Sequence, residues 1–140
     1  MTKQQDFSMW SVNFILFCLA NFLYYGAFYL YIPVLPQYVE MLGGTPADIG
    51  LVGGAFGLSS FIIRPYLGKL ANEWGRKRMM LLGTISFALL FLLFGRVTGV
   101  VPLVVLRLAH GVCLAMYLAA SAAYIADYAP VDRRGEVLGI

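Results

Sequence analysis

Two stripes of polar and aromatic side chains run at helical spacing through apolar stretches of the chain. The members of the first stripe follow one another at offsets of 7, 4 and 3 residues, which keeps them on one side of a helix: His110, Tyr117, Ser121 and Tyr124. A polar face on a membrane helix normally turns toward a water-filled cavity or a bundle interior. The stripe therefore predicts that this helix lines a cavity.

The second stripe combines aromatic rings with one amide, at offsets of 3, 4, 4 and 3 residues: Phe14, Phe17, Asn21, Tyr25 and Phe28. Such rings can serve packing between helices or the wall of a ligand site, and both interpretations stay open. Asn21 favours the ligand wall, because an amide in the middle of a membrane must find a hydrogen-bond partner. Asn21, Tyr25 and Phe28 are therefore cavity candidates.

Three basic side chains lie inside apolar runs. Arg64 and Arg107 each fall near one end of a run, so we expect both guanidinium groups to reach toward the membrane surface. Arg107 lies about 60° from the first stripe and is a candidate for a role in proton movement. His110 can be a hydrogen-bonded interior histidine or a proton carrier, and the sequence leaves both open.

Other chemistry is sparse. Cys18 and Cys113 lie within apolar runs and lack the spacing of a metal site, so they indicate small buried side chains. The sequence contains no nucleophile–base set, no metal-ligating cluster and no carboxylate deep in an apolar run. We expect no enzyme, no catalytic residue, no metal and no cofactor.

The composition indicates that lipid covers most of the surface of this chain. Hydrophobic residues make up 61% of the 140 residues and charged residues only 12%, whereas a soluble domain has about 25% charged residues. The charges lie at the ends of apolar runs rather than on a basic face, which argues against nucleic acid as a partner. The runs predict an all-α membrane protein with four spanning helices, at about residues 10–31, 47–70, 79–95 and 103–126, and a fifth that begins near residue 136.

The ends of these spans carry recognisable signals. Pro33 and Pro36 end the first span and leave residues 37–46 as an outer turn. Thr45 is the predicted N-cap of the second span, with Pro46 and Asp48 in its first turn. Four glycines at four-residue spacing predict that the second span approaches another helix closely: Gly50, Gly53, Gly54 and Gly57.

A basic segment, residues 68–78, connects the second and third spans and holds four of the ten Lys and Arg residues. Seven Lys and Arg residues share one set of span ends, and only Arg96 lies at the opposite ends. Because cytoplasmic loops carry an excess of Lys and Arg, this bias predicts a cytoplasmic N-terminus and a multi-pass protein of the plasma membrane, the inner membrane of a bacterium.

The basic segment resembles the loop 2–3 motif of the major facilitator superfamily, commonly written GxLaDxxGRKxxl. The matching positions are Gly68, Leu70, Ala71, Gly75, Arg76 and Lys77. Asn72 stands where the family usually has Asp. The resemblance implies that this segment is a conformational switch, and the missing charge at Asn72 implies a weaker one. Arg76 can then pair with Asp127 through a charge-assisted contact.

Three further stretches resemble motifs of the same family. Arg107 and Gly111 match the RxxxGxG pattern of span four, with Cys113 in place of the last glycine. Residues 33–37 resemble the PxxPxY-like end of span one in multidrug-efflux members. The third stretch is similar to the loop 4–5 signature: Asp127, Pro130, Arg133, Arg134 and Gly135.

The resemblance implies a fold and a function. The chain would be the N-terminal part of a six-helix half, in a transporter of twelve or fourteen helices. The function would be secondary active transport of small organic solutes by alternating access, as proton-coupled efflux in an antiporter. Its partners would be the lipid bilayer, a small-molecule substrate and the remaining helices of the same polypeptide. The alternatives are a solute importer of the same fold and a non-transporting four-helix membrane protein.

Overall fold

The computed structural model describes residues 11–128, and these form helices without a strand. The elements in chain order are α1 (Val12–Tyr31), α2 (Val34–Met41), α3 (Pro46–Trp74), α4 (Arg76–Leu92), the short 3-10 helix η1 (Phe94–Arg96) and α5 (Val100–Tyr128). Four segments, α1, α3, α4 with η1, and α5, are long and apolar enough to cross a membrane. The predicted all-α membrane fold is confirmed. The predicted start of a fifth span lies outside the described residues.

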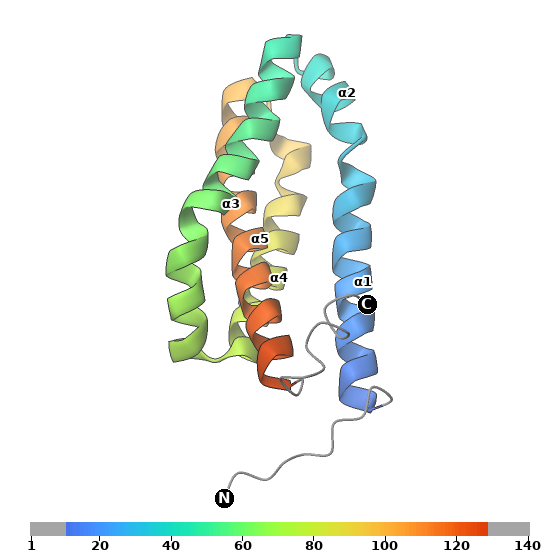
Figure 1. Ribbon diagram of the computed structural model, residues 1–140. Coiled ribbons are helices and arrows are strands. Elements are labelled where there is room, and N and C mark those ends of the chain that lie inside the picture. The colour runs from blue at the N-terminus through green and yellow to red at the C-terminus, as the bar shows by residue number, and fades with distance from the viewer. Residues whose placement is uncertain (1–10, 129–140) are drawn as a thin grey trace, which may run out of the picture.

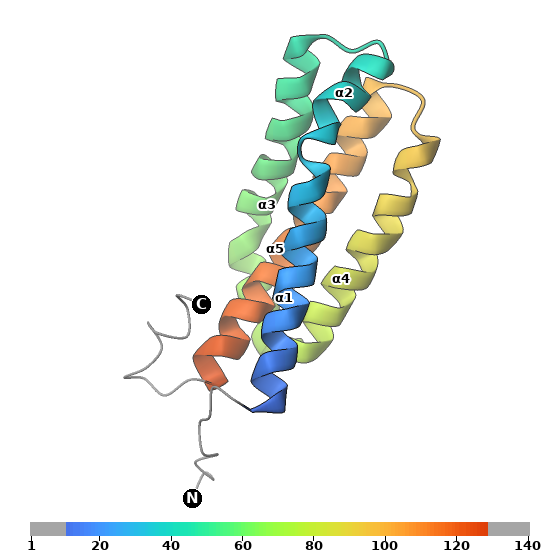
Figure 2. The same ribbon diagram turned by 90° about the vertical axis from the view of Figure 1, so that its right-hand side faces the viewer.

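The four long helices run alternately up and down (Figures 1 and 2). The α3–α4 junction, the start of α1 and the end of α5 lie at one end, which we call the basic end. The short helices α2 and η1 lie at the opposite end. There the Tyr38 hydroxyl of α2 donates a hydrogen bond to the Phe94 carbonyl of η1.

Helix α5 forms the centre of the bundle. In the most apolar 18-residue stretch of α5, 56% of the residues are buried inside the protein. The corresponding share is 17% in each of the other three spans. It packs chiefly on α3 and α4. Gly83 of α4 allows close approach to α5, because a Cβ atom there would lie 3.1 Å from the Cys113 carbonyl oxygen.

Helix α1 is attached mainly through aromatic rings. Tyr24 stacks on Tyr117 of α5 with ring centroids 3.9 Å apart. Phe28 stacks on Phe56 of α3 at 5.3 Å. Because rings rather than small residues make these contacts, α1 lies farther from α5 than α3 and α4 do.

The cap predicted for α3 is confirmed. Thr45 and Asp48 form a capping box: the Thr45 hydroxyl accepts from the Asp48 amide, and the Asp48 carboxylate accepts from the Thr45 amide at 2.7 Å. Pro46 occupies the first helical position. The positive end of the helix dipole also stabilises the acidic Asp48 side chain at this terminus.

The predicted outer turn at residues 37–46 is too long, because residues 34–41 form α2. The fourth span also begins earlier than the predicted residue 103, since α5 starts at Val100, before Pro102. Pro36 and Pro102 each occupy the first turn of a helix, where the missing N–H group needs no partner within the helix. Proline therefore marks the start of each of these helices.

The basic segment 68–78 is not the loop that the sequence predicted. Helix α3 continues to Trp74 and α4 begins at Arg76, so Gly75 alone separates them. Gly75 has φ 89°, a conformation that other residues rarely adopt. Gly68, the first glycine of the resembled motif, lies inside α3. Pro65 also lies within α3, which changes direction along its length (Figure 1).

Within residues 11–128, no other helix closely approaches the glycines of the second span, so the predicted contact stays a prediction. A Cβ atom added at Gly50, Gly53, Gly54 or Gly57 would meet no atom within 4 Å. The close α3–α5 contact instead uses Gly111 of α5, where an added Cβ would overlap the Ser59 hydroxyl and the Phe56 carbonyl oxygen. Glycine spacing identifies a helix face without side chains, but it does not show which helix uses such a face in a close contact with another helix.

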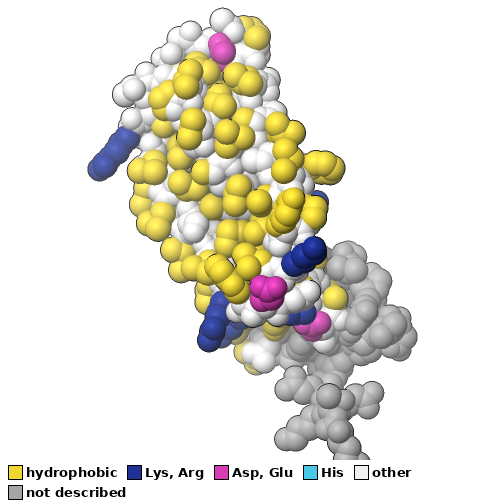
Figure 3. All heavy atoms as spheres, turned by 90° about the vertical axis from the view of Figure 1, so that its left-hand side faces the viewer, with side chains coloured by type: hydrophobic (Ala, Val, Ile, Leu, Met, Phe, Trp, Pro, Cys, Tyr) yellow, Lys and Arg dark blue, Asp and Glu magenta, His cyan; other side chains and the backbone are white. Residues whose placement is uncertain are grey.

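The outer surface is apolar over most of its height. Figure 3 shows hydrophobic side chains covering the middle of the α3 side, with most of the Lys, Arg and acidic side chains toward the lower end and others near the upper end. Large exposed side chains include Phe22, Phe61, Leu92 and Val101. A surface of this kind is suited to lipid.

The role of Gly111 can be tested by adding one methyl group. Gly111→Ala should lower the free energy of unfolding by about 1–3 kcal/mol, because α3 and α5 would have to separate. Gly68→Ala, in open space within α3, should raise it by about 0.5–1 kcal/mol. Thermal or detergent-induced unfolding of the full-length protein measures both. Equal effects of the two substitutions would show that this helix crossing is not close.

Candidate functional site

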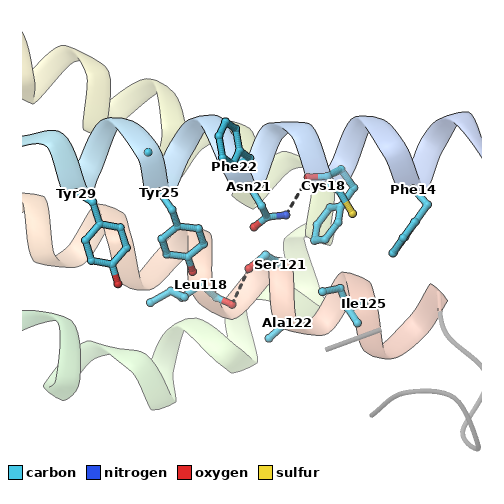
Figure 4. A pocket seen from close by; sticks show the side chains of 12 residues that line it. Phe14, Cys18, Asn21, Phe22, Tyr25, Tyr29, Leu118, Ser121, Ala122 and Ile125 are labelled. Carbon is cyan, nitrogen blue, oxygen red and sulfur yellow. Dashed lines mark hydrogen bonds between the residues drawn. The ribbon is translucent and has the colours of Figure 1, made fainter. Parts of the chain in front are cut away.

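A groove of about 610 Å³ runs between α1 and α5, and we call it the α1–α5 groove (Figure 4). Its walls are aromatic and aliphatic, with a few neutral polar groups. The residues of α1 that line it are Phe14, Phe17, Cys18, Asn21, Phe22, Tyr25, Gly26 and Tyr29. Those of α5 are Leu118, Ser121, Ala122 and Ile125. The volume lies within the range of about 300–1,000 Å³ that is typical of small-molecule sites.

The Asn21 and Ser121 side chains lie on opposite walls of the groove, on α1 and α5 (Figure 4). The Asn21 amide nitrogen donates to the Phe17 carbonyl at 2.9 Å. The Ser121 hydroxyl donates to the Leu118 carbonyl at 3.1 Å. The Ser121 hydroxyl hydrogen and one of the two Asn21 amide hydrogens are thus donated within their own helices, while the second Asn21 hydrogen and the amide oxygen remain for other partners.

The groove brings together one part of each predicted stripe. Asn21 and Tyr25 from the first span lie across from Ser121 of the fourth. Other cavity candidates lie outside the groove, in ring contacts between helices. Tyr124 stacks on Phe17, while Phe28 and Tyr117 make the α1 contacts described above.

Arg107 does not reach the membrane surface as the sequence predicted. Its side chain is only 4% exposed, and its Nε donates to the Val52 carbonyl of α3 at 3.4 Å. The guanidinium carbon lies 4.2 Å from the centroid of the Phe56 ring and 5.7 Å from that of Tyr31. A carbonyl and two aromatic faces favour a cation, which explains how Arg107 can be buried.

His110 lies in an aromatic pocket one turn beyond Arg107. It is 1% exposed and stacks on Phe87 at 4.5 Å and on Phe94 at 5.1 Å between ring centroids. Its Nε2 lies 3.2 Å from the Phe87 carbonyl oxygen. Because a carbonyl only accepts, this nitrogen carries the hydrogen. His110 therefore joins α5 to α4 as an interior side chain and does not line the α1–α5 groove.

Arg64 has a different position from Arg107. It is exposed on α3, as expected for a side chain that extends toward the membrane surface. Cys113, which replaces a glycine of the resembled pattern, is buried in α5.

At the basic end, Arg76 joins three helices. Its Nε lies 2.8 Å from Oδ2 of Asp127 at the end of α5, so the predicted ion pair is confirmed. Its Nη1 donates to the Ala71 carbonyl of α3 at 3.3 Å. Asn72 and Lys77 are exposed, and Leu70 is half-buried. The candidates Arg133, Arg134 and Gly135 lie outside the described residues.

A comparison with known families agrees with this arrangement of spans and motifs. The family model described as Major Facilitator Superfamily matches residues 17–140. The chain belongs to the Major Facilitator Superfamily. Members of this superfamily are in general transporters rather than enzymes.

Individual relatives in the superfamily include drug-resistance proteins. The chain is 33% identical over 110 residues to multidrug resistance protein 2 of Bacillus subtilis. It is 34% identical over 110 residues to the quinolone resistance protein NorA of Staphylococcus aureus. Each match covers 79% of this chain and 28% of the relative, so the chain spans little more than a quarter of their length.

Several groove residues were missed from the sequence. Tyr29 follows Tyr25 by four residues and Cys18 precedes Asn21 by three, so the helical spacing could have found both. The partner of Arg107 could not be found in this way, because the Val52 carbonyl is a backbone group. Among residues 11–128, no group of three His, Cys, Asp or Glu side chains could hold a metal ion.

The cysteines offer a direct test of the groove. Cys18 is half-buried on its wall, whereas Cys113 is buried in α5. In the full-length protein, N-ethylmaleimide should modify Cys18 at least about tenfold faster than Cys113, because thiol reactivity follows access. Mass spectrometry of peptides over time measures both rates, and Cys18→Ser should remove the fast reaction. Equal rates, or a faster reaction at Cys113, would show that the groove is closed.

Proposed function

We propose that this chain forms the first four spans of a secondary transporter that exports small organic solutes by alternating access. The observation that carries the proposal is the α1–α5 groove, in which polar side chains from two spans face an otherwise apolar space. A solute that crosses a membrane through protein needs such a path. The names of the relatives, which refer to multidrug and quinolone resistance, support efflux as its direction.

The proposal includes the setting of the protein. The Lys and Arg residues at the basic end support a cytoplasmic location for this end and for the N-terminus, with Arg96 at the outer side. We assign the protein to the plasma membrane, as the inner membrane of a bacterium. Its partners are lipid, the transported solute and further helices of the same polypeptide, with which residues 1–140 complete a six-helix half.

We also propose that the basic end is a conformational switch. Arg76 contacts α3 through the Ala71 carbonyl and α5 through Asp127, while Gly75 sets the sharp junction before it. A movement of α3 relative to α5 would have to break one of these contacts. The ion pair is partly exposed, so its contribution is modest, on the order of 1 kcal/mol or less.

Neutralising Asp127 tests the switch. Asp127→Asn should change the rate of solute export by about two- to fivefold, because the helix arrangement that holds the ion pair becomes less populated. Glu73→Gln removes an exposed carboxylate of α3 near the same end and should leave the rate unchanged. Export by the full-length protein is measured at matched amounts in the membrane. Identical rates in both variants would remove Arg76 and Asp127 from the switch.

Transport itself is tested with everted membrane vesicles that contain the full-length protein. Respiration acidifies the vesicle interior, so a proton-coupled exporter should concentrate a fluorescent amphiphilic dye inside, and a protonophore should abolish this uptake. Vesicles without the protein are the control. Uptake that survives the protonophore would contradict proton coupling. Dye uptake only in right-side-out vesicles would indicate an importer, and no uptake in either orientation would contradict transport of such solutes.

A further inference from the structure

A second cleft, of about 350 Å³, lies between α4 with η1 and α5, and we call it the α4–α5 cleft. It shares no lining residue with the α1–α5 groove. One wall consists of Leu90, Leu93, Arg96, Val97 and Thr98, and the other consists of Pro102, Val105, Leu106 and Ala109. The four residues of α5 extend over about 10 Å along the helix axis. The cleft is therefore a short apolar channel with a single charged residue, Arg96, in its lining.

The rim of the α4–α5 cleft is apolar and exposed. Leu93 is 44% exposed and Val105 is 61% exposed, whereas Leu106 is buried. Hydrocarbon is the favoured filling of such a cleft between two spans, because water there would lie against apolar walls. The volume is at the low end of the range of small-molecule sites, which suits one acyl chain.

Arg96 supplies the charge of the α4–α5 cleft. Its side chain is exposed, and the ion pair that forms within residues 11–128 joins Arg76 to Asp127, so it leaves Arg96 without a carboxylate. A guanidinium matches phosphate well, because it can donate two parallel hydrogen bonds to the phosphate oxygens. Thr98 lines the same cleft, and its hydroxyl can donate another hydrogen bond.

The backbone that carries Arg96 is fixed by contacts toward the interior. The Phe94 ring is buried, with its centroid 5.0 Å from that of Tyr31, and the Phe94 carbonyl accepts from the Tyr38 hydroxyl. The Arg96 amide donates to the Leu93 carbonyl at 3.0 Å. Because this turn is already ordered, a ligand at Arg96 would not have to order the backbone on binding.

We propose that the α4–α5 cleft binds one anionic phospholipid, with its phosphate on Arg96 and one acyl chain between Leu93 and Val105. Charge complementarity identifies the occupant, because an anionic group at the membrane surface above a hydrocarbon chain matches the cation above the apolar walls. Basic pockets between spanning helices bind anionic headgroups in this way. A zwitterionic lipid fits less well, since its own cation competes with Arg96 for the phosphate. The site is separate from the proposed solute path, and its occupation does not require transport.

A matched pair of photoreactive lipids tests the proposal. Phosphatidylglycerol with a diazirine midway along one acyl chain is added as a minor component to phosphatidylcholine nanodiscs that contain the full-length protein. After illumination, mass spectrometry identifies the labelled peptides. The peptides that contain Leu93 and Val105 should be labelled about three- to tenfold more by this probe than by phosphatidylcholine with the same diazirine chain.

Two arginine variants show whether the preference belongs to the α4–α5 cleft. Arg96→Gln should bring the labelling by the two probes to within about twofold of each other, because the charge that favours the anionic lipid is lost. Arg64→Gln is the matched control, since Arg64 is also exposed but lies on α3, outside the cleft. The control should keep the full preference.

Three results would overturn the proposal. The first is equal labelling of these peptides by the two probes in the unmodified protein. The second is a preference that Arg96→Gln leaves intact, or that Arg64→Gln removes as well. The third is labelling confined to other helices, which would show that another part of the full-length protein covers the α4–α5 cleft.

Discussion

The burial of the Arg107 guanidinium is the constraint on which the arrangement of the helices depends. An arginine inside a spanning helix is costly, up to about 2.5–3.5 kcal/mol at the middle of the helix on insertion scales and less toward its ends, where Arg107 lies. The Val52 carbonyl and the rings of Phe56 and Tyr31 offset this cost, but only where α1, α3 and α5 converge. Gly111, one turn further along α5, permits that convergence because it has no side chain to hold α3 away. The buried charge and the close helix crossing therefore require each other.

The positions of the close helix contacts explain why a groove exists beside α1. Helices α3 and α5 approach closely at Gly111, and α4 and α5 do so at Gly83. Helix α1 instead meets α5 through stacked rings such as Tyr24 and Tyr117, which hold the two backbones apart. Where these rings give way to the smaller side chains of Asn21 and Ser121, space for a solute remains. One wall of the groove is therefore α5, at the centre of the bundle, and the other is α1, which packs less closely on the bundle.

Much of the fold could be predicted because its signals are local. Apolar length identified the four spans, and Thr45, Pro46 and Asp48 identified the start of α3. The helical spacing placed Asn21, Tyr25 and Ser121 on faces that do meet at one groove. Family motifs pointed to Arg76 and Asp127 before their ion pair was known.

The errors concern information that is not local. Charge density made residues 68–78 resemble a loop, but a single glycine with positive φ suffices to reverse the chain between two helices. Arg107 was expected at the membrane surface. Its burial could not be predicted, because its partner is the backbone carbonyl of Val52, which the sequence does not reveal. The close α3–α5 contact depends on Gly111 of α5, to which the glycine spacing of α3 did not point. In each case the deciding partner belongs to another helix or to the backbone.

The central claim, that the α1–α5 groove is the solute path, is tested most directly by a structure of the full-length protein with a transported solute bound. We expect density for the solute between α1 and α5, with a polar group of the solute within hydrogen-bond distance of Asn21 or Ser121. Solute density elsewhere, with the α1–α5 groove filled by lipid or by another helix, would contradict the claim.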